Sequence, residues 1–118
     1  MRMLTMTSYS FGDIILIPFP FTDQTSSKKR PAVVVSSNLY NQEHPDLIIM
    51  AITSQRYIAS RVGDVAVVYW NEAGLLKPSV IKGIIATVEK GLVLRQLGQL
   101  QETDREALGD VLQIILGE

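Results

Sequence analysis

The sequence has 118 residues, with 11 Lys and Arg against 12 Asp and Glu, 47% hydrophobic residues and no cysteine. A chain of this length forms one domain and hides roughly two-thirds of the surface of its unfolded form, so it needs no disulfide or structural metal to fold. The absence of cysteine excludes thiol catalysis and Cys-rich zinc sites, and it favours a reducing cytosol as the compartment. The formal net charge of −1 provides no general basic field.

The longest apolar run, residues 14–21, is too short to cross a membrane and contains Pro18 and Pro20. We therefore expect no membrane-embedded segment. Thr, Ser and Tyr interrupt residues 1–10, which do not resemble a secretory signal. These ten residues are expected to form a loose tail before a single domain at residues 11–118.

Short runs rich in Val and Ile, separated by Gly, Pro, Asn, Asp and Ser, indicate strands up to about residue 97. The near-continuous apolar runs 32–35 and 47–52 indicate strands that are buried on both faces or lie in a curled barrel. The pattern predicts strands at residues 13–19, 30–36, 46–53, 62–69, 79–82, 84–89 and 92–97, with a turn or short helix at 37–42.

The C-terminal segment changes to a helical period. Thr103 and Glu106 have capping-box spacing, which predicts that a helix begins there. The predicted apolar stripe consists of Leu108, Val111, Leu112 and Ile115. The side chains expected to face water are Asp104, Arg105, Asp110 and Gln113. Ile114 and Leu116 lie off the stripe and either widen the buried face or form a subunit contact. The predicted fold is mainly β, a small curled antiparallel sheet with a terminal helix.

Several catalytic classes are excluded by residue counts. His44 is the only histidine, which excludes a two-histidine ribonuclease and a multi-histidine metal site within one chain. His44 precedes Pro45 in a polar loop, where a solvated histidine is the expected state. The sequence has no Walker-type glycine loop, EF-hand loop or HExxH motif. We expect no metal and no cofactor.

Between residues 28 and 61, basic residues outnumber acidic ones by five to two, which predicts a local anion-binding face. Lys28, Lys29 and Arg30 run directly into a predicted strand. An arginine at the first residue of a strand has a fixed Cα and a guanidinium at the rim, ready for a phosphate. The two lysines add long-range attraction. The alternatives are a solvated basic turn or an ion pair between Arg30 and Asp13.

A second polar segment follows the apolar strand 46–53. A hydroxyl held at a strand end, on Thr53 or the neighbouring Ser54, can donate to a phosphoryl oxygen as charge builds there. Gln55, Arg56 and Arg61 continue this polar segment as candidates for contacts with neighbouring phosphates. Tyr57 is a candidate for stacking on an unpaired base. The alternative is an ordinary turn in which the Thr53 hydroxyl bonds to the backbone.

Four ordered pieces carry a family resemblance: Gly-Asp-Ile at 12–14, Arg-Pro-Ala-Val-Val-Val at 30–35, Ala-Ile-Thr-Ser at 51–54 and Pro-Ser-Val-Ile at 78–81. With the stretch 84–97, they make the chain resemble the MazF/PemK family of toxin endoribonucleases. The resemblance implies an SH3-like, plasmid-maintenance-toxin barrel that works as a homodimer in the bacterial cytoplasm. It also implies metal-independent cleavage of single-stranded RNA, usually mRNA, and inhibition by a cognate antitoxin, a small acidic MazE-like protein.

By the same resemblance, Arg30 corresponds to the catalytic arginine of the family and Thr53 to its catalytic threonine or serine. The implied reaction is attack of a ribose 2′-hydroxyl on the adjacent phosphorus, giving 2′,3′-cyclic phosphate and 5′-hydroxyl ends. Because arginine stays protonated at ordinary pH, we expect Arg30 to stabilise charge. The competing hypothesis is a non-catalytic SH3-like binding module, or a gyrase-directed toxin of the same fold that acts on a protein.

Overall fold

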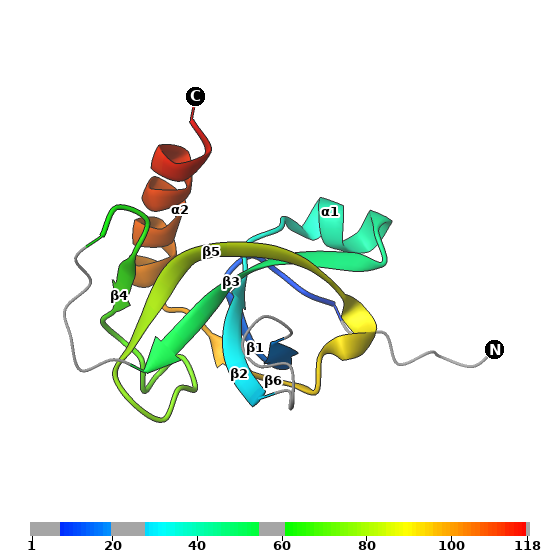
Figure 1. Ribbon diagram of the computed structural model, residues 1–118, viewed down its shortest axis with the longest axis horizontal. Coiled ribbons are helices and arrows are strands. Elements are labelled where there is room, and N and C mark those ends of the chain that lie inside the picture. The colour runs from blue at the N-terminus through cyan, green and yellow to red at the C-terminus, as the bar shows by residue number, and fades with distance from the viewer. Residues whose placement is uncertain (1–7, 20–27, 55–60, 118) are drawn as a thin grey trace.

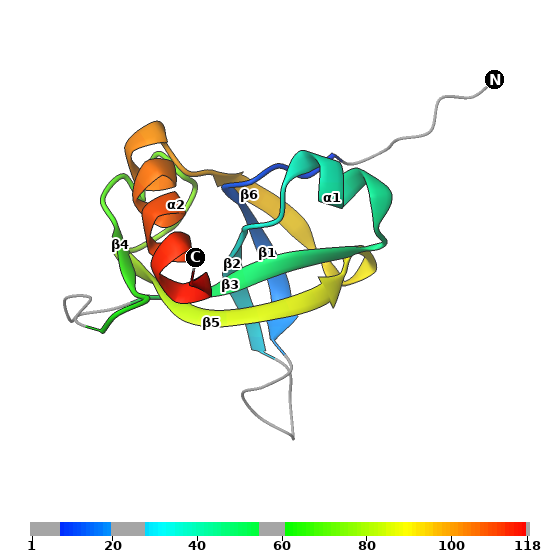
Figure 2. The same ribbon diagram turned by 90° about the horizontal axis from the view of Figure 1, so that it is seen from above.

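The computed structural model describes residues 8–19, 28–54 and 61–117, in which a curled antiparallel sheet carries one helix at each end (Figure 1). Its strand order is β4-β5-β3-β2-β1-β6. The elements are β1 (Asp13–Phe19), β2 (Lys28–Val34), α1 (Asn38–Glu43), β3 (Asp46–Ser54), β4 (Val65–Val67), β5 (Ser79–Glu89), a 3₁₀ turn (Lys90–Leu92), β6 (Arg95–Gln99) and α2 (Glu102–Leu116). The view from above shows α1 and α2 on opposite sides of the molecule (Figure 2).

The first half of the predicted strand pattern is confirmed, and the second half needs corrections. The strand at 62–69 shortens to β4, because residues 68–74 form turns. The strands at 79–82 and 84–89 are one strand, β5, since Gly83 does not interrupt it. A Cβ at Gly83 would make an ordinary contact with the neighbouring loop, 3.4 Å from the Gly63 carbonyl oxygen. The run at 92–97 becomes the 3₁₀ turn followed by β6.

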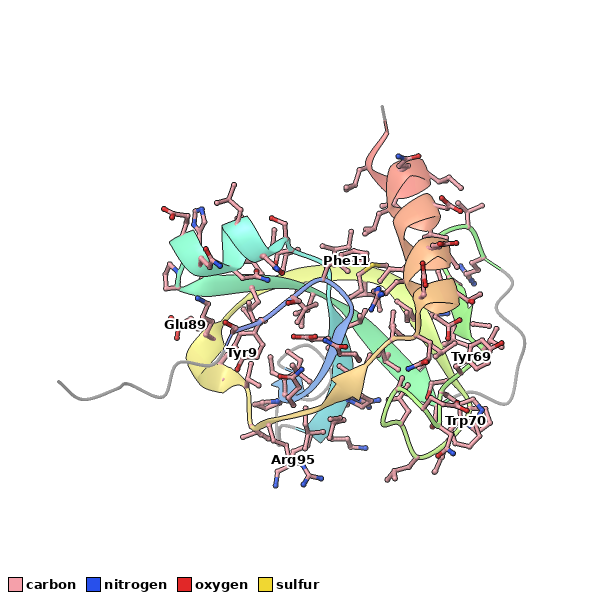
Figure 3. The ribbon with its side chains drawn as sticks, turned by 180° about the vertical axis from the view of Figure 1, so that it is seen from behind. Tyr9, Phe11, Tyr69, Trp70, Glu89 and Arg95 are labelled. Atoms are coloured by element: carbon pink, nitrogen blue, oxygen red, sulfur yellow. The ribbon has the colours of Figure 1, made fainter. Side chains whose placement is uncertain are left out.

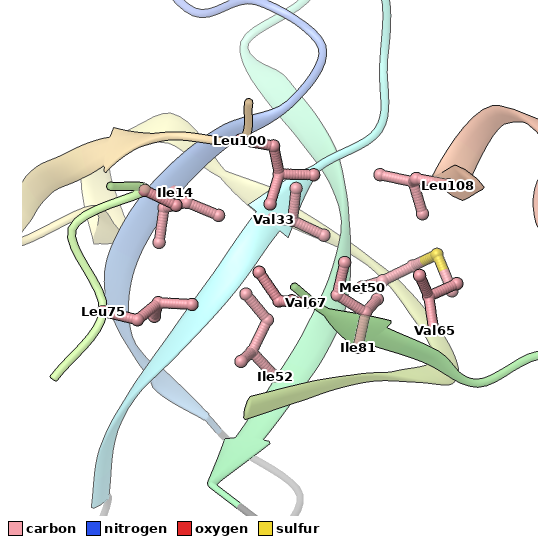
Figure 4. Close-up of a cluster of buried hydrophobic side chains, with 11 residues drawn as sticks. Ile14, Val33, Met50, Ile52, Val65, Val67, Leu75, Ile81, Leu100 and Leu108 are labelled. Atoms are coloured by element: carbon pink, nitrogen blue, oxygen red, sulfur yellow. The ribbon is translucent and has the colours of Figure 1, made fainter. Parts of the chain in front are cut away.

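Strands β1, β2 and β3 are buried on both faces, as their continuous apolar runs predict. Alternate residues point to opposite sides of a strand. Thus Ile14 and Val33 belong to one apolar cluster, while Ile15 and Ala32 belong to another. The first cluster is completed by β4, β5 and Leu108 of α2 (Figure 4). Two apolar clusters therefore hold the three central strands, and the ends of these strands have fixed positions.

The predicted apolar stripe of α2 packs against the first cluster. Leu108 is buried, and the other three residues of the stripe are partly buried. The start of α2 differs from the prediction. The N-cap is Gln101, which makes no side-chain cap bond, and Thr103 lies inside the helix. The expectation that Asp104 faces water is also wrong, because it is 1% exposed and accepts two backbone hydrogen bonds. Arg105 is half-buried, and its aliphatic stem lies against Gly12.

Residues 9 and 10, which precede the expected domain, contact the rest of the protein. Asn41 Nδ2 donates to the Tyr9 carbonyl at 2.9 Å, and Ser10 N donates to Asp13 Oδ2 at 2.8 Å. Tyr9 also packs against the second apolar cluster. Burial, and then the nearby Asp13 carboxylate, raise the pKa of Tyr9 above its ordinary value of 10.0. Of the expected tail at residues 1–10, Tyr9 and Ser10 thus pack on the domain, while residues 1–7 lie outside the described part.

Within the described ranges, no helix has the length and apolar character needed to cross a membrane.

Candidate functional site

A groove of about 560 Å³ opens at the end of the sheet where β2 begins and β3 ends. The start of β2 and the end of β3 form one side, and the segment between β4 and β5 forms another together with β6. Six apolar side chains line it: Leu16, Pro31, Ile52, Leu75, Leu76 and Leu97. The groove thus joins parts of the chain that are far apart in sequence.

The charged side chains that line this groove are all basic. They are Lys28, Lys29, Arg30, Lys77 and Arg95. No Asp or Glu is among the described lining residues, although the chain as a whole has a net charge of −1. Cations gathered in a concave site raise the local concentration of anions there. The groove is therefore suited to a polyanion that also has apolar surface.

Of the cations in this set that belong to β2, Arg30 lies furthest along the strand. It pairs with Ile17 in the β1–β2 ladder, so its backbone is fixed by the sheet. Its Nε is buried and has no hydrogen-bond partner among the described residues. The alternative of an ion pair with Asp13 is not formed, because the Asp13 oxygens accept from Ser10 N and from Gln99 Nε2. Arg30 lines the groove although its Nε is itself buried, so any ligand contact must come from the terminal nitrogens of the guanidinium.

Thr53 lines the same groove as Arg30. The antiparallel β2–β3 ladder runs from Val34 and Ile49 to Ala32 and Ala51, and the two residues lie beyond its last pair, Arg30 in β2 and Thr53 in β3. The Thr53 hydroxyl donates to the adjacent Ser54 carbonyl at 3.3 Å, which is the kind of backbone bond that the alternative interpretation expects. This long local bond is easily exchanged for one to a ligand oxygen.

The groove contains five of the nine residues that the sequence singled out, namely Lys28, Lys29, Arg30, Thr53 and Ser54. Arg61 is exposed and does not line it. The other three candidates, Gln55, Arg56 and Tyr57, lie outside the described residues.

His44 also lies outside the groove. It is exposed and stacks on Tyr40 of α1, with ring centroids 4.0 Å apart and an interplanar angle of 12°.

Sequence reasoning missed Lys77 and Arg95. Arg95 enters the groove because β6 pairs with β1, which places it opposite Leu16. It lies at the edge of the molecule in the rear view (Figure 3). Lys77 is held by Ser79, whose Oγ donates to the Lys77 carbonyl at 2.8 Å. No local pattern marks either cation; only the pairing of the first strand with the last would have found Arg95.

Comparison with known proteins agrees with this architecture. The model of the family described as "PemK-like, MazF-like toxin of type II toxin-antitoxin system" matches residues 10–116. The chain therefore belongs to the PemK/MazF toxin family. A search of curated proteins finds no match.

Solved structures of similar fold include several toxins. A mycobacterial endoribonuclease in complex with its cognate antitoxin has a TM-score of 0.75 at 19% identity, covering 92% of this chain and 95% of that chain. MazF of Deinococcus radiodurans has a TM-score of 0.72 at 16% identity, covering 95% and 99%. A MazE-MazF structure from the same organism has a TM-score of 0.73 at 19% identity, covering 94% and 98%. These likenesses establish the MazF-type barrel as the fold.

Proposed function

We propose that this protein is an endoribonuclease that cleaves single-stranded RNA, mRNA above all, at preferred sequences without a metal ion, as the toxin of a type II toxin–antitoxin pair in the bacterial cytoplasm. The observation that carries the proposal is that Arg30 and Thr53 line one cationic groove in a chain of the PemK/MazF family. The solved structures of similar fold that are titled endoribonucleases support it.

The proposed reaction begins with attack of the ribose 2′-hydroxyl on the adjacent phosphorus. As the bond from the 2′-oxygen to phosphorus forms, the 2′-hydroxyl gives up its proton to water; the bond from phosphorus to the 5′-oxygen breaks, and the leaving oxygen takes up a proton from water. The products are a 2′,3′-cyclic phosphate and a 5′-hydroxyl. Negative charge grows on the non-bridging oxygens during attack, so fixed donors aimed at those oxygens lower the barrier. The Arg30 guanidinium supplies charge and paired N–H donors, and the Thr53 hydroxyl supplies one more donor.

The substrate is expected to be unpaired RNA because in-line attack requires the 2′-oxygen, the phosphorus and the leaving oxygen to align, which a regular duplex backbone prevents. Lys28, Lys29, Lys77 and Arg95 neutralise neighbouring phosphates, and the apolar lining contacts bases. Cations and hydroxyls, rather than carboxylates, make up the polar lining that the structure describes, which suits a reaction stabilised by Arg30 instead of a metal.

The same groove is the proposed site of inhibition. A segment of an acidic antitoxin, disordered when free, would place acidic and apolar residues on the cationic and apolar lining. The antitoxin-bound structures of similar fold support this partner. We also propose that the toxin acts as a homodimer, as its family does. Co-purification with a small acidic protein from the neighbouring reading frame, which RNA competes away, would test the antitoxin; a monomer without such a companion would contradict this part.

The activity is tested by incubating the purified protein with long single-stranded RNA of mixed sequence in EDTA. We expect fragments with 2′,3′-cyclic phosphate and 5′-hydroxyl ends at a small set of sequences. Arg30→Ala and Thr53→Val are each expected to lower kcat by roughly 10²–10³-fold, the loss seen when one donor to a developing oxyanion is removed. Thr53→Ser keeps the hydroxyl and should retain most of the activity.

Thr87→Val is the matched control, because Thr87 is an exposed threonine of β5 outside the groove lining. Its activity should equal that of the wild type. RNA that stays intact across many sequences would favour a non-catalytic binding module or a toxin that acts on a protein. Cleavage that survives Arg30→Ala would remove Arg30 from the proposed mechanism.

A further inference from the structure

Asp104, in the first turn of α2, holds a segment that the proposed mechanism does not explain. Its carboxylate oxygens accept from Val68 N at 3.0 Å and from Tyr69 N at 2.8 Å. The side chain is 1% exposed, and among the described cations none forms an ion pair with it. A buried carboxylate is costly unless its oxygens are hydrogen-bonded, so these two amides account for its burial. Val68 and Tyr69 are the first two residues of the segment between β4 and β5, residues 68–78, which we call the β4–β5 segment.

Two other contacts hold the rest of this segment. Gly74 and Gly98 let it lie directly on β6: a Cβ at Gly98 would be 2.2 Å from the Ala73 carbonyl oxygen, and one at Gly74 would be 2.2 Å from the Leu97 carbonyl oxygen. Within the segment, Ala73 N, Gly74 N and Leu75 N donate to carbonyls three to five residues earlier in the chain. In Figure 3 its labelled start, Tyr69 and Trp70, lies beside α2 and β4. The β4–β5 segment is thus a fixed wall of the groove.

The wall presents two exposed side chains to the groove. Leu76 is 92% exposed, and Lys77 beside it is also exposed; both line the groove. An exposed apolar side chain next to a cation offers one surface for a nucleobase face and one for a phosphate. Arg30 and Thr53 are fixed at strand ends on the other side.

We propose that Asp104 is a positioning residue for RNA binding: it holds the β4–β5 segment so that Leu76 and Lys77 contact the RNA beside the scissile phosphate. This inference rests on the proposed function, since it names a further contact surface of the same groove. Asp104 itself touches no substrate. Its carboxylate acts through hydrogen bonds from the backbone amides of Val68 and Tyr69, which fix the position of the β4–β5 segment.

Asp104→Asn is the informative variant. Asn has nearly the same shape, but it offers one acceptor and turns an NH₂ donor toward the second backbone amide. The segment should then loosen at its start without loss of the fold. Asp110→Asn is the matched control, because Asp110 is an exposed carboxylate on the same helix.

Two readouts are needed. Hydrogen exchange by NMR should show faster exchange of the Val68 and Tyr69 amides in Asp104→Asn and no change in Asp110→Asn. Binding of a 2′-O-methyl RNA oligonucleotide, which cannot be cleaved, should weaken by roughly tenfold in Asp104→Asn and similarly in the double variant Leu76→Ser/Lys77→Gln. In cleavage assays both should raise KM with little change in kcat, because the lost contacts are to bound RNA and not to the reacting atoms.

The decisive comparison combines the variants. If Asp104 acts through Leu76 and Lys77, the triple variant should bind RNA less than twofold more weakly than the double variant. The reason is that the double variant has already lost the contacts that Asp104 positions. An additive, full tenfold loss would overturn the proposal. So would unchanged affinity in the double variant, which alters only exposed side chains and tests the wall even if Asp104→Asn does not fold. If the wild type neither binds nor cleaves RNA, the proposed function fails, while the amide exchange still decides whether Asp104 anchors the segment.

Discussion

Substitution of Gly98 by alanine tests whether the backbone of the β4–β5 segment packs directly against the backbone of β6. The added Cβ would lie 2.2 Å from the Ala73 carbonyl oxygen and 2.8 Å from its carbon, whereas real Cβ contacts are not shorter than 3.0 Å. Both partners are backbone atoms, so no side chain can rotate to relieve the clash. The β4–β5 segment and β6 must then move apart by about 0.8 Å, which brings the 2.2 Å distance from the Cβ to the Ala73 oxygen up to the 3.0 Å limit.

Overpacking of this kind costs about 1–3 kcal/mol of unfolding free energy. For a domain of this size the melting temperature should fall by roughly 4–12 °C. Gly109→Ala is the control: a Cβ there meets nothing within 4 Å. In the interior of α2 alanine is favoured over glycine by up to about 1 kcal/mol, so this variant should melt a few degrees higher. Thermal unfolding followed by circular dichroism measures both shifts. A Gly98→Ala protein that melts at or above the wild-type temperature would refute the close approach.

Other predictions concern the core, the charge of the groove and alkaline pH. Leu108→Ala should cost about 2–5 kcal/mol in urea unfolding, because this fully buried side chain would leave a cavity; Ile114→Ala, on the same helix but 65% exposed, should cost under about 0.5 kcal/mol. Arg95→Ala should reduce the slope of log Kd against log salt for single-stranded RNA by about 0.7, the value of one phosphate contact, and an unchanged slope would remove Arg95 from the interface. Because the pKa of Tyr9 is higher in the folded protein than in the unfolded chain, its contribution to stability is present below pH 10.0 and disappears as pH rises through the raised value. The urea midpoint of the wild type should therefore fall more steeply than that of Tyr9→Phe as the pH rises above 10.0, and parallel curves would contradict this.

The parts of the fold that the sequence predicts well are those fixed by local pattern. The continuous apolar run of β3 can only be buried on both sides, and the structure surrounds it with two apolar clusters. The sequence singles out Arg30 and Thr53 because each lies at the end of such a run, and their catalytic roles stay a prediction. Both line one groove, since β2 begins and β3 ends at the same end of the sheet.

The parts that local pattern cannot predict depend on contacts across the chain. Asp104 lies on the polar side of the helical pattern, yet residues 68–69 cover it and supply its hydrogen bonds. The apolar run at 62–69 has strand-like composition, but Val68 and Tyr69 leave the sheet to meet that carboxylate. Lys77 and Arg95 become neighbours of Arg30 only when the β4–β5 segment closes on β6.

The position of β6 has a consequence for synthesis of the protein. The strand next to β1 is the last one to leave the ribosome, and the helix that follows it carries the carboxylate that fixes the groove wall. A nascent chain that has not reached residue 104 holds Arg30 and Thr53 but lacks the structure that encloses them. A chain that ends before residue 104 is therefore expected to lack the hydrogen bonds that fix the start of the β4–β5 segment.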